Sequence, residues 1–166
     1  MNVLARVMQA AWNEANKPIG YVKGDEFEHF VRKVLFPDSH YELLSKTHDY
    51  ITNKHDFVAS SKEPDFKFKS RRTGEEFYVE AKYRQGFHEG MLEWCKPYQL
   101  KRYQEIDGKI PVYIVLGIGG HPEMPDSVCL VPMKHIRFTR LYPSVLRKYS
   151  ISSHSSLQET ELMSLA

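Results

Sequence analysis

The sequence is poor in cysteine, and this shortage excludes disulfide-rich proteins and most structural zinc domains. Two cysteines among 166 residues are too few for a disulfide framework and form no CxxC metal motif. A zinc site would have to combine His88, Cys95, His121 and Cys129, whose spacing matches no zinc motif. We therefore expect both cysteines to act as small buried hydrophobic residues.

Long hydrophobic runs are also missing. No stretch reaches the roughly 20 apolar residues that a membrane helix needs. The first residues, MNVLARVMQAAWNE, lack the basic start, the long apolar segment and the small-residue cleavage site of a signal peptide. We therefore expect a cytoplasmic protein without a membrane span.

A large excess of one charge sign is also missing, since the net charge is only +2. The isoelectric point near 8.4 lies below the value of about 9 above which many nucleic-acid-binding domains are found. A carboxylate-rich active site would cancel basic residues elsewhere, and a bound cation would restore positive charge locally. Composition therefore leaves the question of a nucleic-acid partner open.

The first third of the chain predicts two amphipathic helices. One covers residues 3–12, and the other follows Gly24 and ends at Pro37, with a break at residues 17–20 between them. Residues 39–61 have a mixed pattern, with a short strand expected around Phe57–Val58. The apolar stripes are formed by Leu4, Val7, Met8 and Ala11 in the first helix and by Phe27, Phe30, Val31, Val34 and Leu35 in the second.

The middle of the chain predicts a β-hairpin, because residues 65–69 and 77–83 alternate in polarity around a turn that contains Gly74. A helix at 97–107 begins with a proline, which suits the first helical turn. The run at 111–119 is continuously apolar and β-branched, as in a strand covered on both faces. A strand at 128–133 and a short helix at 144–149 follow.

This order of elements predicts one α/β domain over residues 1–149, with a central mixed sheet between two helical layers. Residues 150–166 are rich in serine and weakly patterned, so we expect a flexible C-terminal tail.

Chemistry concentrates on the predicted hairpin. Side chains at i and i+2 of a strand share a face, so Glu80 and Lys82 point away from the core-facing Val79 and Ala81. The partner strand begins at Asp65, which places a second carboxylate near Glu80. Two neighbouring carboxylates repel each other unless a cation lies between them, and Mg²⁺ prefers such oxygen ligands together with substrate phosphate.

A site of this kind suits phosphodiester hydrolysis. Lys82 would orient or deprotonate the attacking water, or stabilise charge in the transition state. The plainer alternative is that these residues form the solvated face of a hairpin, with Glu80 and Lys82 as an ordinary ion pair.

At this point the sequence resembles the PD-(D/E)XK nuclease superfamily, which includes restriction endonucleases, Holliday-junction resolvases and RecB-type exonucleases. A glycine followed four residues later by a helical glutamate matches the first motif of the family. The later motifs are a proline–aspartate pair, an E-x-K and a RecB-like Q-x-x-x-Y. The matching residues, in chain order, are Gly24 and Glu28, Pro64 and Asp65, Glu80 and Lys82, and Gln99 and Tyr103.

The resemblance implies a restriction-endonuclease-like core in the order αβββαβ. It also implies Mg²⁺, for which Mn²⁺ would substitute, at Asp65, Glu80 and the Ala81 carbonyl. Glu28 would reach this metal directly or through a water molecule, and Glu26 is its competitor for that role. Gln99, one helical turn before Tyr103, would position the attacking water or hold a phosphate.

Basic and aromatic residues around the motifs are candidates for nucleic-acid contacts, and the loop at 85–96 is a candidate substrate-contacting lid. For phosphate binding we expect Lys67, Lys69, Arg84, Arg102 and Tyr103, and for base stacking Phe66, Phe68, Tyr83 and Tyr98.

The resulting hypothesis is a Mg²⁺-dependent deoxyribonuclease. No helix-turn-helix or zinc finger is recognisable in the sequence, so we expect structure-directed or non-specific cleavage, or recruitment by a partner protein. The resemblance to resolvases further implies a homodimer. Two alternatives stay open: a nucleic-acid-binding module of the same fold that has lost catalysis, and a plain interaction protein that binds neither metal nor DNA.

Overall fold

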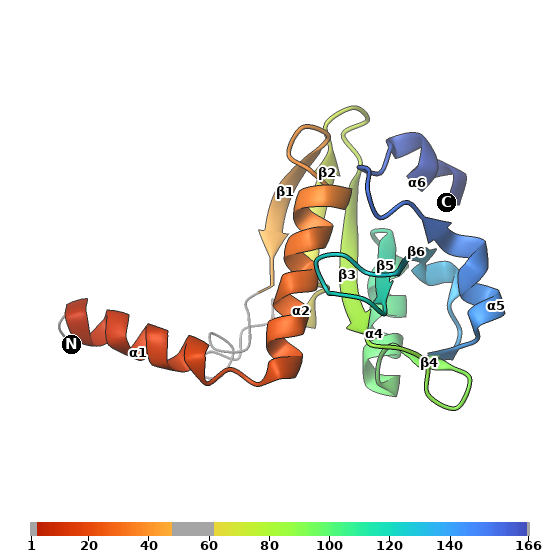
Figure 1. The fold of residues 1–166 in the computed structure, drawn as a ribbon. Coiled ribbons are helices and arrows are strands. Elements are labelled where there is room, and N and C mark those ends of the chain that lie inside the picture. Colours follow the sequence, from red (N-terminus) through yellow and green to blue (C-terminus); the bar gives the residue numbers. More distant parts are fainter. Residues whose placement is uncertain (1–2, 48–61, 166) are drawn as a thin grey trace.

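The centre of the protein is a mixed six-stranded sheet, and Figure 1 labels most of its strands. The computed structural model describes residues 3–47 and 62–165. Strands β3 and β5 run parallel, and the other neighbouring pairs of this sheet run antiparallel. In spatial order the strands are β1 (Tyr41–Lys46), β2 (Phe66–Ser70), β3 (Glu76–Arg84), β5 (Val112–Ile118), β6 (Ser127–Pro132) and β8 (Ser150–Ile151).

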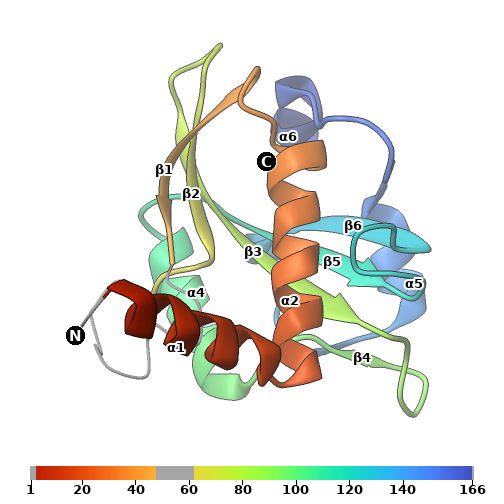
Figure 2. The same cartoon turned by 60° about the vertical axis from the view of Figure 1, so that its left-hand side comes forward.

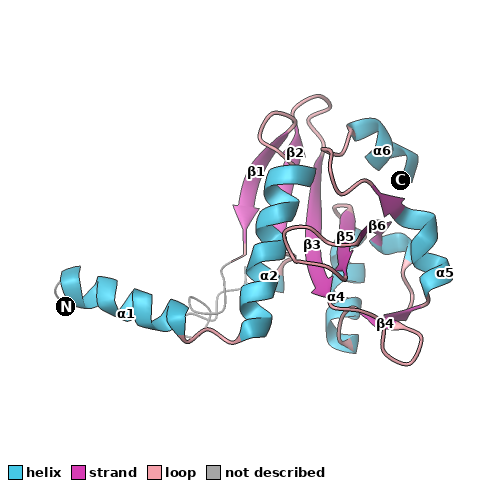
Figure 3. Ribbon diagram, viewed as in Figure 1, coloured by secondary structure: helices cyan, strands magenta, loops and turns pink. Residues whose placement is uncertain are grey.

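Helices cover both faces of the sheet, as Figure 3 shows in cyan. Residues of α2 and α6 pack into the hydrophobic cluster on one face, and residues of α4 and α5 into the cluster on the other. The predicted three-layer arrangement is therefore confirmed. The helices are α1 (Val3–Ala15), α2 (Ile19–Phe30), η1 (Val31–Leu35), α4 (Pro97–Asp107), η3 (Met133–His135), α5 (Pro143–Leu146), η4 (Arg147–Tyr149) and α6 (Glu159–Leu165).

Strand β3 separates the two clusters by the alternation of its side chains. Val79 and Ala81 belong to the cluster that contains Phe27 of α2, whereas Tyr78 belongs to the cluster that contains Tyr103 of α4. Successive residues of a strand point to opposite faces, so Glu80 and Lys82 share the face of Tyr78. This is the arrangement predicted from the sequence.

Several elements lie where the sequence placed them. The hairpin is formed by β2 and β3, the helix at 97–107 is α4, and α5 with η4 covers the expected short helix. Strand β5 is buried at every residue, because helices cover both of its faces. A second, two-stranded sheet pairs β4 (Leu92–Glu93) with β7 (Arg140–Leu141) and ties part of the expected loop at 85–96 to the body.

The start of the second helix differs from the prediction. Helix α2 begins at Ile19, directly after its N-cap residue Pro18, and not after Gly24. Proline is compatible with a helix start because it lacks only an N–H that would have no partner there. The break between the helices is therefore confined to the residues before Ile19.

Strand β1 was not predicted from the sequence. It is an edge strand with an irregular register between Leu43 and Ser45, and Tyr41 is its one fully buried residue. Such a strand needs few inward apolar residues and leaves little alternation to detect. The strand expected around Phe57–Val58 lies outside the described residues.

The prediction of a flexible C-terminal tail is wrong for residues 150–165. Strand β8 pairs with β6, and Leu157 and Leu162 are buried in the cluster beneath α2. The backbone N–H of Leu157 also donates to the carbonyl of Leu35 at 3.0 Å. The serine-rich composition suggested flexibility, but a few well-spaced leucines are enough to hold this segment against the core.

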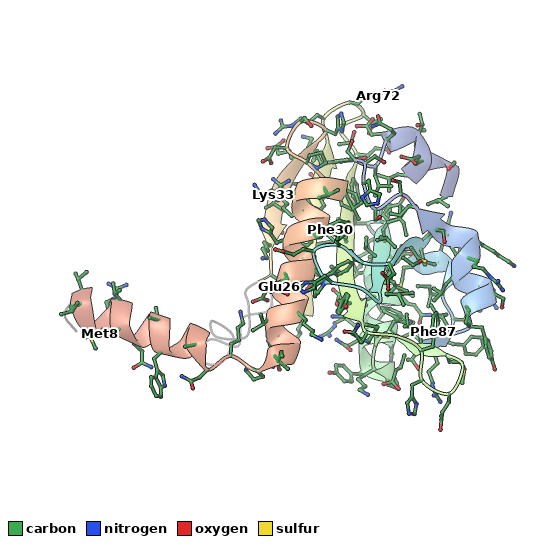
Figure 4. The ribbon with its side chains drawn as sticks, in the orientation of Figure 1. Met8, Glu26, Phe30, Lys33, Arg72 and Phe87 are labelled. Atoms are coloured by element: carbon green, nitrogen blue, oxygen red, sulfur yellow. The ribbon has the colours of Figure 1, made fainter. Side chains whose placement is uncertain are left out.

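Helix α1 projects away from the body of the molecule (Figures 1 and 2). Its apolar stripe has formed, but Val7, Met8 and Trp12 are 60%, 65% and 67% exposed, and Figure 4 shows Met8 on this projecting helix. Among the helices described, none has the length and hydropathy required to cross a membrane.

Candidate active site

A cavity of about 630 Å³ lies where β3 ends beside the first half of α2 and the start of α4. In Figure 2, α2 crosses the sheet with its N-terminal half next to this end of β3. The lining includes every residue that the sequence predicted for catalysis or metal binding, and also Tyr103, which was predicted for phosphate binding. They are Glu28, Asp65, Glu80, Ala81, Lys82, Gln99 and Tyr103.

Asp65 and Glu80 are held together by the backbone of the hairpin. The N–H of Asp65 donates to Oε2 of Glu80 at 3.1 Å, and the N–H of Ala81 donates to Oδ2 of Asp65 at 2.8 Å. The β2–β3 register pairs Phe66 with Val79, which brings the residue before Phe66 opposite Glu80. Strand pairing therefore fixes the two carboxylates.

Lys82 completes this group from the same strand. Its Nζ lies 2.5 Å from Oε1 of Glu80, and its side chain is 22% exposed. Burial alone would lower the pKa of the ammonium, but the charges of Glu80 and Asp65 outweigh burial and raise the pKa of Lys82. Lys82 therefore faces the cavity as a cation and hydrogen-bond donor.

The electrostatics of the carboxylates indicate a site that lacks positive charge. Burial, followed by the charge of Glu80, raises the pKa of Asp65 well above its usual range. Burial also raises the pKa of Glu28, although Lys46 opposes this shift with an ion pair of 3.2 Å between Nζ and Oε2. Clustered carboxylates that resist ionisation are stabilised by a cation placed between them.

The residues present fit a hard divalent cation. Among residues 3–47 and 62–165, no group of three or more His, Cys, Asp or Glu side chains is arranged to hold a metal ion. Mg²⁺ commonly uses only one or two carboxylates together with water and substrate phosphate. In a strand the N–H and C=O of one residue point to the same side, so the Ala81 carbonyl shares the side on which its N–H meets Asp65.

Glu28 and Glu26 are distinguished by their positions on α2. Glu28 lines the cavity with Asp65 and Glu80, whereas Glu26 is not part of its lining. Lys46, the partner of Glu28, was missed as a site residue because its strand β1 was missed.

The Q-x-x-x-Y pair contributes in two different ways. Tyr103 is 3% exposed, and burial, followed by the charges of Glu80 and Asp65, raises the pKa of its hydroxyl, so Tyr103 places a neutral hydroxyl near these carboxylates. Gln99 lines the cavity, but its Oε1 accepts from the N–H of Lys96 at 3.0 Å. Part of the role of Gln99 is therefore to cap the start of α4.

Of the predicted basic residues, Arg84 and Arg102 line the cavity, and Lys67 and Lys69 do not. Lys67 instead pairs with Glu76, with 2.7 Å between Nζ and Oε2. Lysines 67 and 69 share the face of Asp65, but each step of two residues along β2 leads about 6–7 Å away from it. Contacts of these two lysines with DNA stay a prediction.

Arg84 has a structural role in addition to facing the cavity. Its guanidinium donates to the backbone carbonyls of Tyr83, Glu93 and Trp94, each at 2.8 Å. These bonds connect the end of β3 to the segment that leads into α4. Trp94, expected in a substrate-contacting lid, is fully buried and belongs to the core.

Other charged residues around the cavity were not singled out from the sequence. Asp25, which pairs with Lys17, lines it together with Glu63. Glu63 Oε1 accepts a hydrogen bond of 3.2 Å from the hydroxyl of Tyr78. Glu63 directly precedes the proline–aspartate motif, but a single acidic residue there carries no sequence signal of its own.

With this geometry, the protein has the restriction-endonuclease-like fold of the PD-(D/E)XK nucleases: α2, β1, β2, β3, α4 and β5 follow the αβββαβ order. Among solved structures, it is similar to the 1.6 Å structure of Hjc, a Holliday junction resolvase from the archaeal hyperthermophile Archaeoglobus fulgidus. The TM-score is 0.52 at 14% sequence identity, and the match covers 82% of this chain and 99% of the resolvase. A scan against protein-family models and a search of curated proteins found no match.

Proposed function

We propose that this protein is a metal-dependent nuclease that hydrolyses phosphodiester bonds in DNA, in a structure-directed or non-specific manner. The observation that carries the proposal is the hydrogen-bonded group of Asp65, Glu80 and Lys82 in one cavity. Its fold is that of an enzyme that acts on branched DNA, which supports the same substrate class.

Each residue has a defined part in this proposal. Asp65, Glu80 and the Ala81 carbonyl would hold a Mg²⁺ or Mn²⁺ ion, with Glu28 at its edge. When bound, such an ion supplies Lewis-acid activation of the scissile phosphate and the attacking water. Lys82, held by Glu80, donates to the water or to a phosphate oxygen. Tyr103 would offer its neutral hydroxyl to the carboxylate side of the site.

The test is cleavage of a labelled panel of linear, circular, branched and single-stranded DNA and of RNA, with Mg²⁺, Mn²⁺ or EDTA. Wild type should cut with metal and not with EDTA, and Lys82→Ala should lose at least about 100-fold in rate, as when a transition-state donor is removed. Lys33→Ala is the matched control, because Lys33 lies on the outer surface of η1, as labelled in Figure 4.

The alternatives predict other results. DNA binding without cleavage by any variant would favour a binding module that has lost catalysis, and binding of neither metal nor DNA would favour an interaction protein. Cleavage that survives Lys82→Ala would place the active site elsewhere. The homodimer and the partner protein expected from the sequence stay predictions.

A further inference from the structure

The active-site cavity does not stand alone but continues on both sides along α4. A second cavity, of about 390 Å³, shares Arg84 and Gln99 with it. A third, of about 310 Å³, shares Glu63 and Arg102 with it and extends to Lys109. The three cavities therefore adjoin one another along α4, and the middle one holds the proposed catalytic residues. We call the three together the α4 groove.

The size of the α4 groove suits one strand of nucleic acid. Helix α4 has 11 residues and is therefore about 16 Å long at a rise of 1.5 Å per residue. A stacked strand advances about 3.4 Å per nucleotide, so a path along the helix accommodates about four or five nucleotides. The cationic side chains along this path come from Lys96, Arg102 and Lys109.

Arg102 is prepared for an anionic ligand in the middle of the groove. Its guanidinium lies over the rings of Tyr98 and Tyr103, with 5.8 and 5.6 Å to the ring centroids. Its Nε is buried and has no hydrogen-bond partner among the described residues. The Arg102 side chain lines two of the three cavities, so a phosphate in the groove would meet the positive charge of its guanidinium.

Tyr98 offers a flat surface next to this cation. It is 67% exposed, and the guanidinium of Arg102 covers its ring. The other aromatic residues that the sequence offered for stacking are buried in the core, with exposures of 1% for Phe66, 0% for Phe68 and 9% for Tyr83. Of these four, Tyr98 alone is able to stack on a base.

Further along, the loop between β3 and β4 adds another exposed ring. Phe87 is 44% exposed, and its neighbours Gly86 and His88 line the second cavity. Figure 4 shows Phe87 at the end of the molecule where this loop projects. Neither Tyr98 nor Phe87 lines the three cavities, but each lies next to residues that do. Exposed aromatic rings beside a groove with cationic side chains are a typical means of binding an unpaired strand.

We propose that the α4 groove binds an unpaired strand of DNA, with a base stacked on Tyr98 and its phosphate on Arg102, so that the substrate carries unpaired nucleotides beside the cleaved bond. Bases within a duplex are paired and stacked on each other, and an exposed tyrosine gains nothing from them. This inference rests on the proposed nuclease function for its place in catalysis, but strand binding itself is independent of cleavage.

The experiment measures binding to fluorescent DNA in EDTA, where no metal-dependent cleavage occurs, at one fixed salt concentration. The probes are a 12-nucleotide single strand, the matching duplex and a duplex with a single-stranded flap. We expect wild type to bind the single strand and the flap at least 10-fold more tightly than the duplex. Tyr98→Ala should weaken single-strand binding about 5- to 150-fold, the range for loss of one base–aromatic stack, and leave duplex binding unchanged.

The matched control is Tyr142→Ala, because Tyr142 is 58% exposed and lies at the start of α5, outside the α4 groove. Circular dichroism verifies that both variants are folded. Equal affinity for duplex and single strand, or equal losses in Tyr98→Ala and Tyr142→Ala, would overturn the proposal. Tyr98-dependent strand binding without any cleavage would support the α4 groove while the nuclease function fails, so the two proposals fail separately.

Discussion

At the scale of the residue, the buried and clustered carboxylates of the active site lower the stability of the fold. Asp65 accepts a hydrogen bond from Ala81, yet burial and Glu80 raise its pKa well above the usual range. An aspartate in an unfolded chain ionises near pH 3.9. Between this pH and the higher pKa of Asp65 in the folded chain, the unfolded chain loses the proton first. The folded state is therefore progressively disfavoured as pH rises through the folded-state pKa.

Asp65→Asn should therefore stabilise the metal-free protein while it abolishes cleavage. The amide oxygen still accepts from Ala81, but the carboxylate repulsion is gone. We expect a gain of about 1 kcal/mol at pH 7, which corresponds to about 2–4 °C in Tm for a chain of this size. Thermal unfolding in EDTA measures it, and the gain should shrink as pH falls toward 4. A lower Tm for Asp65→Asn at pH 7 would contradict this account.

The thiols of the two cysteines should be unreactive in the folded protein. Burial raises the pKa of the Cys95 thiol to about 12, and burial also raises the pKa of Cys129. Since the thiolate is the reactive form, Ellman's reagent at pH 8 should modify less than about 0.1 thiol per chain within minutes. Unfolding in guanidinium should release both of the two thiols. Rapid modification of the native protein would show that one of them is accessible.

At the scale of the element, the approach of α2 to β5 sets the position of Glu28. Gly117 of β5 has no side chain, and a Cβ there would lie only 2.7 Å from Cζ of Phe27. Phe27 itself is fully buried and directly precedes Glu28. A single missing methyl group therefore allows the helix to bring its carboxylate to the cavity.

Gly117→Ala should push α2 away from the sheet and impair both stability and catalysis. Overpacking of a buried contact typically costs about 1–3 kcal/mol, and we expect cleavage to fall at least about 10-fold because Glu28 moves with Phe27. Gly108→Ala is the control, since the nearest atom to its Cβ would be at an ordinary 3.5 Å. Denaturant unfolding and the cleavage assay measure the two effects. Equal behaviour of both variants would mean that α2 does not depend on this close approach.

Elements with a strong local pattern could be predicted from sequence, and elements defined by distant contacts could not. The alternation in β3 and the proline at the start of α4 predicted those elements and the shared face of Glu80 and Lys82. Strand β1 and its residue Lys46 were missed, because an edge strand receives its partner from β2, about twenty residues away in the chain. The capping role of Gln99 and the carbonyl contacts of Arg84 also depend on atoms that no spacing rule specifies.

At the scale of the whole molecule, the C-terminal segment closes the core over the face that carries α2. The hydroxyl of Tyr41 donates to the carbonyl of Leu157 at 3.0 Å, and Ser70 donates to the carboxylate of Glu159. These bonds connect α6 and the segment before it to the two strands farthest from them in the chain. The segment is therefore a structural part of the domain.

Leu157→Ala and Leu162→Ala should each destabilise the protein by about 2–5 kcal/mol, the usual cost of a cavity left by a buried leucine. Their side chains are 2% and 6% exposed. Leu44→Ala serves as the control, because Leu44 is 39% exposed and surface substitutions usually change stability by less than about 0.5 kcal/mol. Urea unfolding measures all three. Losses below about 0.5 kcal/mol at both buried leucines would support the original prediction that the C-terminal segment is flexible.

The position of α6 also determines when, during synthesis, the active site can form. Every proposed catalytic residue has been translated once Tyr103 is added, but the core beneath α2 still lacks Leu157 and Leu162. At about 5–20 residues per second, the ribosome needs roughly 3–12 s to add residues 104–165. During that interval the β2–β3 hairpin can already pair Asp65 with Glu80, but α2, which carries Glu28, lacks part of the core beneath it. Cleavage activity would therefore begin only after Leu157 and Leu162 have packed into the core beneath α2.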